Sequence, residues 1–239
     1  MVTFISGYRG ELISLVGRKI NIMLNSSQDR RKACTLMLAN FLFTGANSQS
    51  SRLQETSYFV LGKEFELTSL HVDKPEVNDL LEAQIVLEKK KLRTPKLISE
   101  IRRQDTELIA VFVDELSASR SDKVMFKERL ALVLSDTADV VIHFKKIFNR
   151  PRPSELLPNI NPVLNVPLHR AYPSGHATQA IVAARMLIEW TGLQNAQLEK
   201  LATRVGRNRE IAGLHFPSDT VAGFNLGSQL VEYFKKGNL

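Results

Sequence analysis

Three cations in the second half of the sequence stand where the hydrophobic pattern predicts apolar residues. Lys145 continues the apolar face of the helix predicted over 122–149, and Arg209 lies on the apolar face of the helix predicted from Asn195 onward. Arg152 follows the first of these helices. Buried cations need an anionic partner, so the pattern predicts an anion-binding pocket. Taken singly, each has a plainer interpretation: Lys145 as a lysine snorkelling at a helix end, and Arg209 as half of a structural ion pair.

The segment Arg150–Pro153 ends the first helix at its prolines and adds a further cation. Lys145, Arg150 and Arg152 fall within seven residues of one another. Like charges repel at this spacing, and the nearest acid downstream is a single carboxylate, Glu155. We therefore expect a bound anion to neutralise the cluster.

The segment Tyr172–His176 is a turn that opens another helix, which we expect to begin near Ser174. The free backbone amides of Ser174 and Gly175, together with the helix dipole, are predicted to bind an anion. Gly175 also permits close approach of the backbone. His176 would then lie beside the bound anion.

The segment Gly213–Asp219 ends the helix that carries Arg209 and starts a new one, with Pro217 near its first position. Asp219 follows His215 by four residues, so its carboxylate is placed to accept the imidazole N–H of His215. That contact would leave the other ring nitrogen free as a nucleophile. The alternative is an acid at a helix N-terminus beside an ordinary histidine.

Together these residues resemble the signature of the type 2 phosphatidic acid phosphatase and vanadium haloperoxidase superfamily. That signature joins Lys-x6-Arg-Pro, Pro-Ser-Gly-His and Ser-Arg-x5-His-x3-Asp. Its members occur here in the same order: Lys145, Arg152–Pro153, Pro173–His176, Arg209, His215 and Asp219. Asn208 stands where the family has a serine that supports the pocket by hydrogen bonding, and asparagine retains that ability. The match covers about 75 of the 239 residues.

The resemblance implies an all-α helical bundle and a phosphatase that requires no metal or other cofactor. It implies that the phosphoryl oxygens are bound by five residues: Lys145, Arg152, Ser174, Gly175 and Arg209. His215 would attack phosphorus to form a phosphohistidine, and Asp219 would orient His215. His176 would protonate the leaving group and then activate the hydrolytic water.

Two features of the sequence point to different activities, one to a phosphatase and the other to a haloperoxidase. Arg150, two residues before Arg152, resembles the soluble bacterial class A acid phosphatases. His169, seven residues before His176, resembles algal vanadium bromoperoxidases, in which the same pocket holds vanadate and the residue matching His215 is the vanadium ligand. Chain length and Arg150 favour a soluble phosphatase acting on phosphate monoesters. A vanadate-dependent haloperoxidase that oxidises halides with hydrogen peroxide is the alternative.

A phosphate- or nucleic-acid-binding module without catalytic activity is a third alternative. Both histidines and Asp219 are retained, which argues against it, and the aromatic interleaving of a nucleic-acid groove is absent from the sequence. The formal net charge of +7 does not choose between partners. We expect a small anionic phosphorylated substrate and no nucleic acid.

No apolar stretch approaches the roughly 18 residues typical of a membrane span, which disfavours an integral lipid phosphatase. The N-terminus is interrupted by glycines and charges, so we expect no signal peptide. The single cysteine, Cys34, excludes a disulfide within the chain and is expected in the core. These features predict a soluble cytoplasmic protein without a membrane span.

A chain of 239 residues could form one helical domain or two small ones, and we expect a single domain over 1–239. The hydrophobic content of 44% is typical of a globular protein, and apolar helix faces suggest a homodimer. Partial alternation over 58–72 predicts a short hairpin or an extended crossover. Helical patterns are predicted over four further ranges: 10–43, 76–92, 95–118 and 122–149. Two more helices follow from Ser174 and Asn195, with Gly192 between them.

Overall fold

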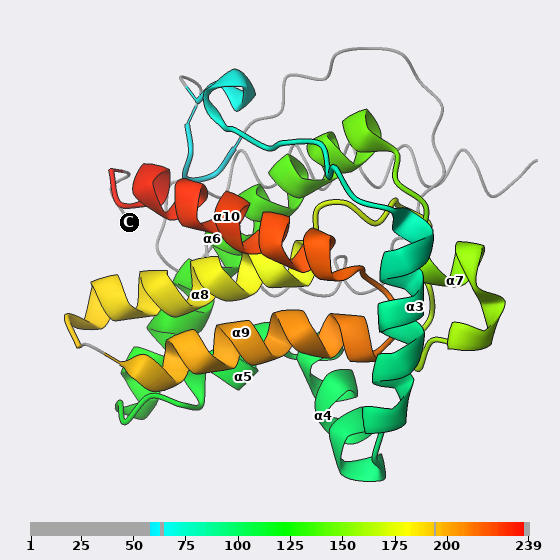
Figure 1. Ribbon diagram of the computed structural model, residues 1–239. Helices are drawn as coiled ribbons and strands as arrows, with labels where there is room; N and C mark the ends of the chain where they lie inside the picture. Colours follow the sequence, from blue (N-terminus) through cyan, green and yellow to red (C-terminus); the bar gives the residue numbers. More distant parts are fainter. Residues whose placement is uncertain (1–57, 63–64, 194, 237–239) are drawn as a thin grey trace, which may run out of the picture. The chain divides into compact units, whose positions relative to one another are not determined.

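Figure 1 shows a computed structural model of the protein, which describes residues 58–62, 65–193 and 195–236. The chain divides into two units after Thr44, and all described residues belong to the second. The helix predicted over 10–43 and the core position expected for Cys34 lie outside the described residues. The single domain over 1–239 stays a prediction.

The described part of the chain is helical and contains no β-strand, which confirms the all-α bundle. Its α-helices in chain order are α3 (Asp79–Lys89), α4 (Pro95–Thr106), α5 (Leu108–Val113), α6 (Arg120–Phe148), α7 (Pro153–Leu156), α8 (Gly175–Thr191), α9 (Ala196–Ile211) and α10 (Pro217–Phe234). Short 3₁₀ turns occupy Leu67–Ser69, Lys90–Leu92 and Pro158–Ile160. No helix among these residues is both long and apolar enough to cross a membrane.

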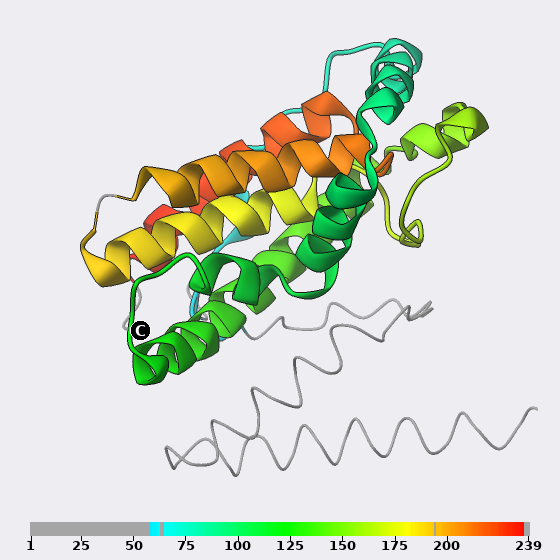
Figure 2. The same cartoon turned by 90° about the horizontal axis from the view of Figure 1, so that it is seen from below.

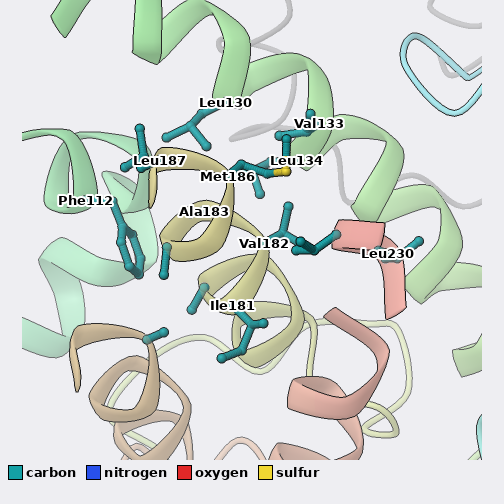
Figure 3. Packing of buried hydrophobic residues seen from close by; sticks show 14 of the residues in the cluster. Phe112, Leu130, Val133, Leu134, Ile181, Val182, Ala183, Met186, Leu187 and Leu230 are labelled. Atoms are coloured by element: carbon teal, nitrogen blue, oxygen red, sulfur yellow. The ribbon is translucent and has the colours of Figure 1, made fainter. Parts of the chain in front are cut away.

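Helix α8 is the centre of the bundle. Its residues are buried on nearly every side, as a helix that is apolar all round requires. It packs against α5, α6, α9 and α10 (Figures 1 and 2). Figure 3 shows Phe112 of α5 and Leu130 of α6 converging on Met186 and Leu187 of α8. Because α8 is enclosed, its N-terminus is held firmly against the neighbouring helices.

Local sequence signals set the boundaries of the last helices as predicted. Ser174 caps α8 by accepting from the amide of Ala177, and Asn195 caps α9 by accepting from the amide of Gln197. Gly192 ends α8 with a left-handed φ of 65°, which glycine adopts without a steric penalty. α10 begins at Pro217, as expected for proline in a first turn.

One prediction for the first half of the bundle was wrong, and of the two structures predicted over 58–72 the extended crossover is observed. The continuous helix predicted over 95–118 is interrupted at Glu107, whose φ of −130° and ψ of 33° are not helical, so α4 and α5 are separate. No hairpin forms in the described part of 58–72, which is an extended crossover with one 3₁₀ turn. Buried Asp136 of α6 holds this crossover by accepting hydrogen bonds from three successive amides, those of residues 59–61.

Candidate active site

The C-terminal ends of α6 and α9 meet the N-terminal ends of α8 and α10 at one end of the bundle (Figure 1). Helix N-termini carry partial positive charge, and the segments that join these helices carry the cations and histidines singled out by the sequence. The candidate site lies at this junction.

His215 and Asp219 form a buried pair, as predicted. His215 Nδ1 lies 3.2 Å from Asp219 Oδ2, which also accepts from the amide of Phe216 at 2.9 Å. The Nε2 atom lies 3.3 Å from Nη1 of Arg152. Burial and the nearby cations Arg152 and Lys145 lower the pKa of His215 well below its usual value. The ring is therefore neutral near pH 7, with its proton on Nδ1 and the lone pair of Nε2 directed toward Arg152.

Lys145 is buried rather than snorkelling, since only 2% of it is exposed. Its ammonium group donates to the carbonyl oxygens of Arg170 at 2.7 Å and Ala171 at 2.8 Å. Burial and the charge of Arg152 lower the pKa of Lys145 well below its usual value. A bound anion would reverse that effect by favouring the charged ammonium.

Arg152 lies between the nucleophile candidate and the loop that precedes α8. Its guanidinium donates to the carbonyl oxygens of Leu214 at 2.8 Å and His169 at 2.9 Å. Burial lowers the pKa of Arg152 to about 10. The ring of His169 approaches Arg152 as well, with 3.1 Å between Nδ1 and Nη2. Shielding of the ring from solvent, with the charges of Lys145 and Arg152, lowers the pKa of His169 to about 4.

Arg209 is fully buried and pairs with a carboxylate that the sequence did not single out. Its Nη1 lies 2.8 Å from Asp105 of α4, and its Nη2 donates to the carbonyl oxygen of Ile101 at 2.8 Å. Its Nε has no hydrogen-bond partner among the described residues. A buried donor left without a partner is costly, and a ligand oxygen would satisfy it.

Asp105 also faces His176, with 3.6 Å between its Oδ1 and the histidine Nε2. Loss of solvent and the charge of Arg209 lower the pKa of His176 well below its usual value, and a hydrogen bond with the backbone of Asp105 opposes them. No motif marks Asp105, because it lies inside a predicted helix among other polar residues. Only the packing of α4 against α9 brings it to the site.

The anion-binding amides differ from the prediction by one residue. The amide of Ser174 is not free, because it donates to the carbonyl oxygen of Asp219 at 2.9 Å. The amides of Gly175 and His176, in the first turn of α8, have no acceptor among the described residues. Gly175 keeps its predicted place, and Ser174 instead ties α8 to α10.

Arg150 does not face the anion pocket, and the idea that an anion must neutralise it was wrong. Its five N–H groups are taken by four acceptors: Asp79 and Glu82 of α3 and Ser218 and Asp219 of α10. Glu155, the nearest acid downstream in the sequence, forms an ion pair with Arg170. Carboxylates that are far away in the sequence thus neutralise part of the charge of the cation cluster.

Asn208 forms hydrogen bonds with side chains of α4 rather than with the cations of the site. Its side-chain amide donates to Glu100 at 3.0 Å and to Gln104 at 2.9 Å. Both acceptors precede Asp105 on α4. Asn208 therefore helps to hold the helix that carries the partner of Arg209.

An open groove of about 610 Å³ adjoins the site. One wall is the end of α4, with Arg102 and Asp105, and the other is the segment 162–165. Asp105 both lines the groove and faces His176, which itself does not line the groove.

A helical bundle with a buried pocket of cations and histidines at one end defines a class of proteins that bind phosphate-like oxyanions. A family model described as the PAP2 superfamily matches residues 129–232, which contain Lys145, Arg152, Arg209 and both site histidines. The similarity to the PAP2 superfamily thus covers the part of the chain that holds the candidate site.

Two curated relatives match part of the chain. The decaprenylphosphoryl-5-phosphoribose phosphatase of Mycolicibacterium smegmatis is 36% identical over 90 residues, which are 38% of this chain and 47% of that protein. The protein of the same name from Mycobacterium tuberculosis is 30% identical over 89 residues, which are 37% and 48% of the two chains. The chain thus spans about half the length of the curated relatives it matches.

The fold has a solved counterpart described as the first bacterial vanadium-dependent iodoperoxidase. It superposes with a TM-score of 0.56 at 15% identity and covers 70% of this chain and 52% of that chain. At this identity the likeness concerns the fold alone, and it agrees with the all-α architecture.

Proposed function

We propose that the protein hydrolyses phosphate monoesters through a phosphohistidine intermediate on His215. The observation that carries this proposal is the environment of His215. One ring nitrogen is held by Asp219, and the other faces Arg152 in a pocket that also contains buried Lys145 and Arg209. A neutral imidazole facing buried cations suits attack on an electrophile that carries negative charge.

The reaction divides among the residues of the pocket. Lys145, Arg152 and the unpartnered Nε of Arg209 would bind phosphoryl oxygens, with the amides of Gly175 and His176 at the N-terminus of α8. The lone pair on Nε2 of His215 forms the bond to phosphorus as the ester oxygen leaves. Asp219 stabilises the charge that develops on the ring of His215.

His176 would donate a proton to the leaving oxygen and then accept one from the water that hydrolyses the phosphohistidine. In the pocket without an anion its pKa is lowered. A bound phosphate dianion would offset the charge of Arg209 and favour protonated His176. The leaving group would lie toward the groove that Asp105 lines, because Asp105 also faces His176.

The first experiment is hydrolysis of an activated aryl phosphate by metal-free protein, with a phosphorylated sugar as a second substrate. We expect turnover that vanadate inhibits, and an acid-labile phosphoenzyme after rapid quenching. His215→Ala should abolish both, whereas His176→Ala should slow turnover mainly for poor leaving groups. Normal turnover in His215→Ala would rule out the mechanism.

A vanadate-dependent haloperoxidase is the second candidate, and the contact between His169 and Arg152 favours it. The donors that would bind phosphate, including the unpartnered Nε of Arg209, also suit vanadate, and His215 would be the vanadium ligand. Vanadate would supply activation of peroxide for halide oxidation. Efficient bromide or iodide oxidation after vanadate loading, with feeble ester hydrolysis, would favour this activity over the phosphatase. The phosphatase itself needs no cofactor in our proposal.

A further inference from the structure

Arg150 carries a set of contacts that substrate binding does not explain. Its side chain is 4% exposed and contacts three carboxylates. Nη1 donates to Asp219 at 2.6 Å, and Nη2 donates to Asp79 at 2.7 Å and to Glu82 at 2.8 Å. With Nε on Asp79 and Nη1 also on Ser218, no N–H group of Arg150 remains for a phosphoryl oxygen.

Both oxygens of Asp219 are engaged, one of them by Arg150. Oδ1 accepts from Arg150, and Oδ2 accepts from the amide of Phe216 and faces His215. A carboxylate anchored on one oxygen presents the other in a single direction, so Arg150 determines how Asp219 meets the imidazole. The guanidinium also lies over the ring of Phe216, with 4.1 Å from its carbon to the ring centroid.

Helix α3 holds Arg150 in place and also holds the first turn of α10. Glu82 accepts from Nη2 of Arg150 and, with its other oxygen, from the amide of Ser218 at 3.0 Å. It also accepts from the hydroxyl of Ser218. Ser218 is the neighbour of Asp219, so Glu82 fixes both the backbone and the arginine that position that carboxylate.

We propose that Arg150 is a positioning residue: together with Asp79 and Glu82 of α3 it holds Asp219, and through Asp219 it orients His215, without contacting the substrate. This inference rests on the proposed function for its kinetic test. It makes α3, which lies outside every motif of the signature, a part of the catalytic machinery.

The kinetic test compares Arg150→Gln with Arg152→Gln, using an activated aryl phosphate as substrate and inorganic phosphate as inhibitor. In Arg150→Gln we expect kcat to fall on the order of 10²-fold, because misorientation of a nucleophile slows the chemical step. The Ki for phosphate should change by less than about 3-fold. In Arg152→Gln the Ki should instead rise roughly tenfold or more, since a direct charge-assisted contact is lost.

Two conservative variants and a control complete the kinetic test. Arg150→Lys keeps the charge but loses the planar fork, so its kcat should lie between those of wild type and Arg150→Gln. Glu82→Gln should also lower kcat without raising the Ki for phosphate. Arg185→Gln is the matched control, because Arg185 likewise binds a carboxylate, Glu199, and a serine hydroxyl, that of Ser228. It should leave both constants unchanged.

A second measurement does not depend on turnover. The proton on Nδ1 of His215 should give a downfield NMR signal in wild type and in Arg185→Gln, and the signal should shift or disappear in Arg150→Lys and Glu82→Gln. If wild type hydrolyses no ester, the proposed function fails while this signal still tests the positioning role.

The inference is overturned if folded Arg150→Lys and Glu82→Gln retain both full kcat and the wild-type signal. It is also overturned if Arg150→Gln weakens phosphate binding as strongly as Arg152→Gln does. If circular dichroism shows that Arg150→Gln is unfolded, the two conservative variants decide the matter.

Discussion

Asp105 places a negative charge inside a pocket that otherwise attracts anions. Its Oδ1 lies 2.8 Å from Arg209 and 3.6 Å from His176. To act as a general acid, His176 must be protonated, and the nearby cations disfavour that state. The negative charge of the Asp105 carboxylate favours the protonated imidazole. We infer that Asp105 prepares His176 for proton donation and keeps Arg209 aimed into the pocket.

Asp105→Asn should therefore slow esters with poor leaving groups more than activated ones. We expect alkyl phosphates to lose on the order of 10²-fold in kcat/KM, the lower end of what a general acid contributes. Aryl phosphates with good leaving groups need little protonation and should lose much less. The measurement is the dependence of log kcat/KM on leaving-group pKa, with Asp114→Asn, an exposed partner of Arg103, as control. Equal losses for both substrate classes would contradict this role.

Arg209 contacts α4 and also offers a nitrogen to a ligand, and this combination requires the several nitrogens of a guanidinium group. Two of its nitrogens are held by Asp105 and Ile101, and Nε remains for a ligand. Arg209→Lys keeps the charge but has a single nitrogen, so we expect the Ki for phosphate or vanadate to rise roughly tenfold. Inhibition kinetics check this, with exposed Arg207→Lys on the same helix as control. An unchanged Ki would show that Nε does not meet the anion.

At the scale of elements, α8 and α10 approach closely through two glycines. A Cβ atom on Gly223 would lie 2.6 Å from the carbonyl oxygen of Ser174, and one on Gly227 would lie 2.6 Å from that of Thr178. Backbone atoms cannot move aside as a flexible side chain can. The spacing of these helices, and hence the contact between Ser174 and Asp219, depends on the absence of side chains here.

Gly227→Ala should destabilise the protein by roughly 1–3 kcal/mol, the usual cost of overpacking. Urea unfolding measures this, and Val221→Ala on the exposed face of α10 should change stability by less than about 0.5 kcal/mol. Gly223→Ala should in addition lower kcat, because its added methyl group meets the carbonyl of Ser174 beside the site. Wild-type stability in Gly227→Ala would show that the two helices can separate without cost.

At the scale of the whole molecule, the site contains histidines whose lowered pKa values disfavour their protonation. Burial is the main physical cause that lowers the pKa values of His176 and His215. The unfolded chain binds these protons below about pH 6.5 while the folded protein does not. Each such histidine therefore lowers stability as the pH falls through that value, and has no such effect above it.

His176→Asn should for this reason lose less stability than wild type when the pH is lowered from about 7.5 to about 5. The measurement is Tm across that range, and His71→Asn, which alters an exposed histidine, is the control. Inorganic phosphate should raise Tm by binding the folded state. A variant that follows the wild-type pH dependence would mean that His176 is protonated equally in both states.

The sequence by itself determined the helices α6, α8, α9 and α10 and the residues that meet at their ends. The caps Ser174 and Asn195, the prolines and the apolar period act over a few residues, so they can be read without a structure. The pairing of His215 with Asp219 is of the same kind, because four residues separate them across a helix start.

Only the tertiary structure decided what surrounds those residues. Arg150 meets Asp79 across 71 positions and Glu82 across 68, and Arg209 meets Asp105 across 104. The hydrogen bond from the amide of Ser174 to the carbonyl oxygen of Asp219 likewise exists only because α8 packs on α10. Local periodicity records which face of a helix is buried but not which helix it meets. The charges that neutralise a buried cation therefore become visible only when the helices are packed together.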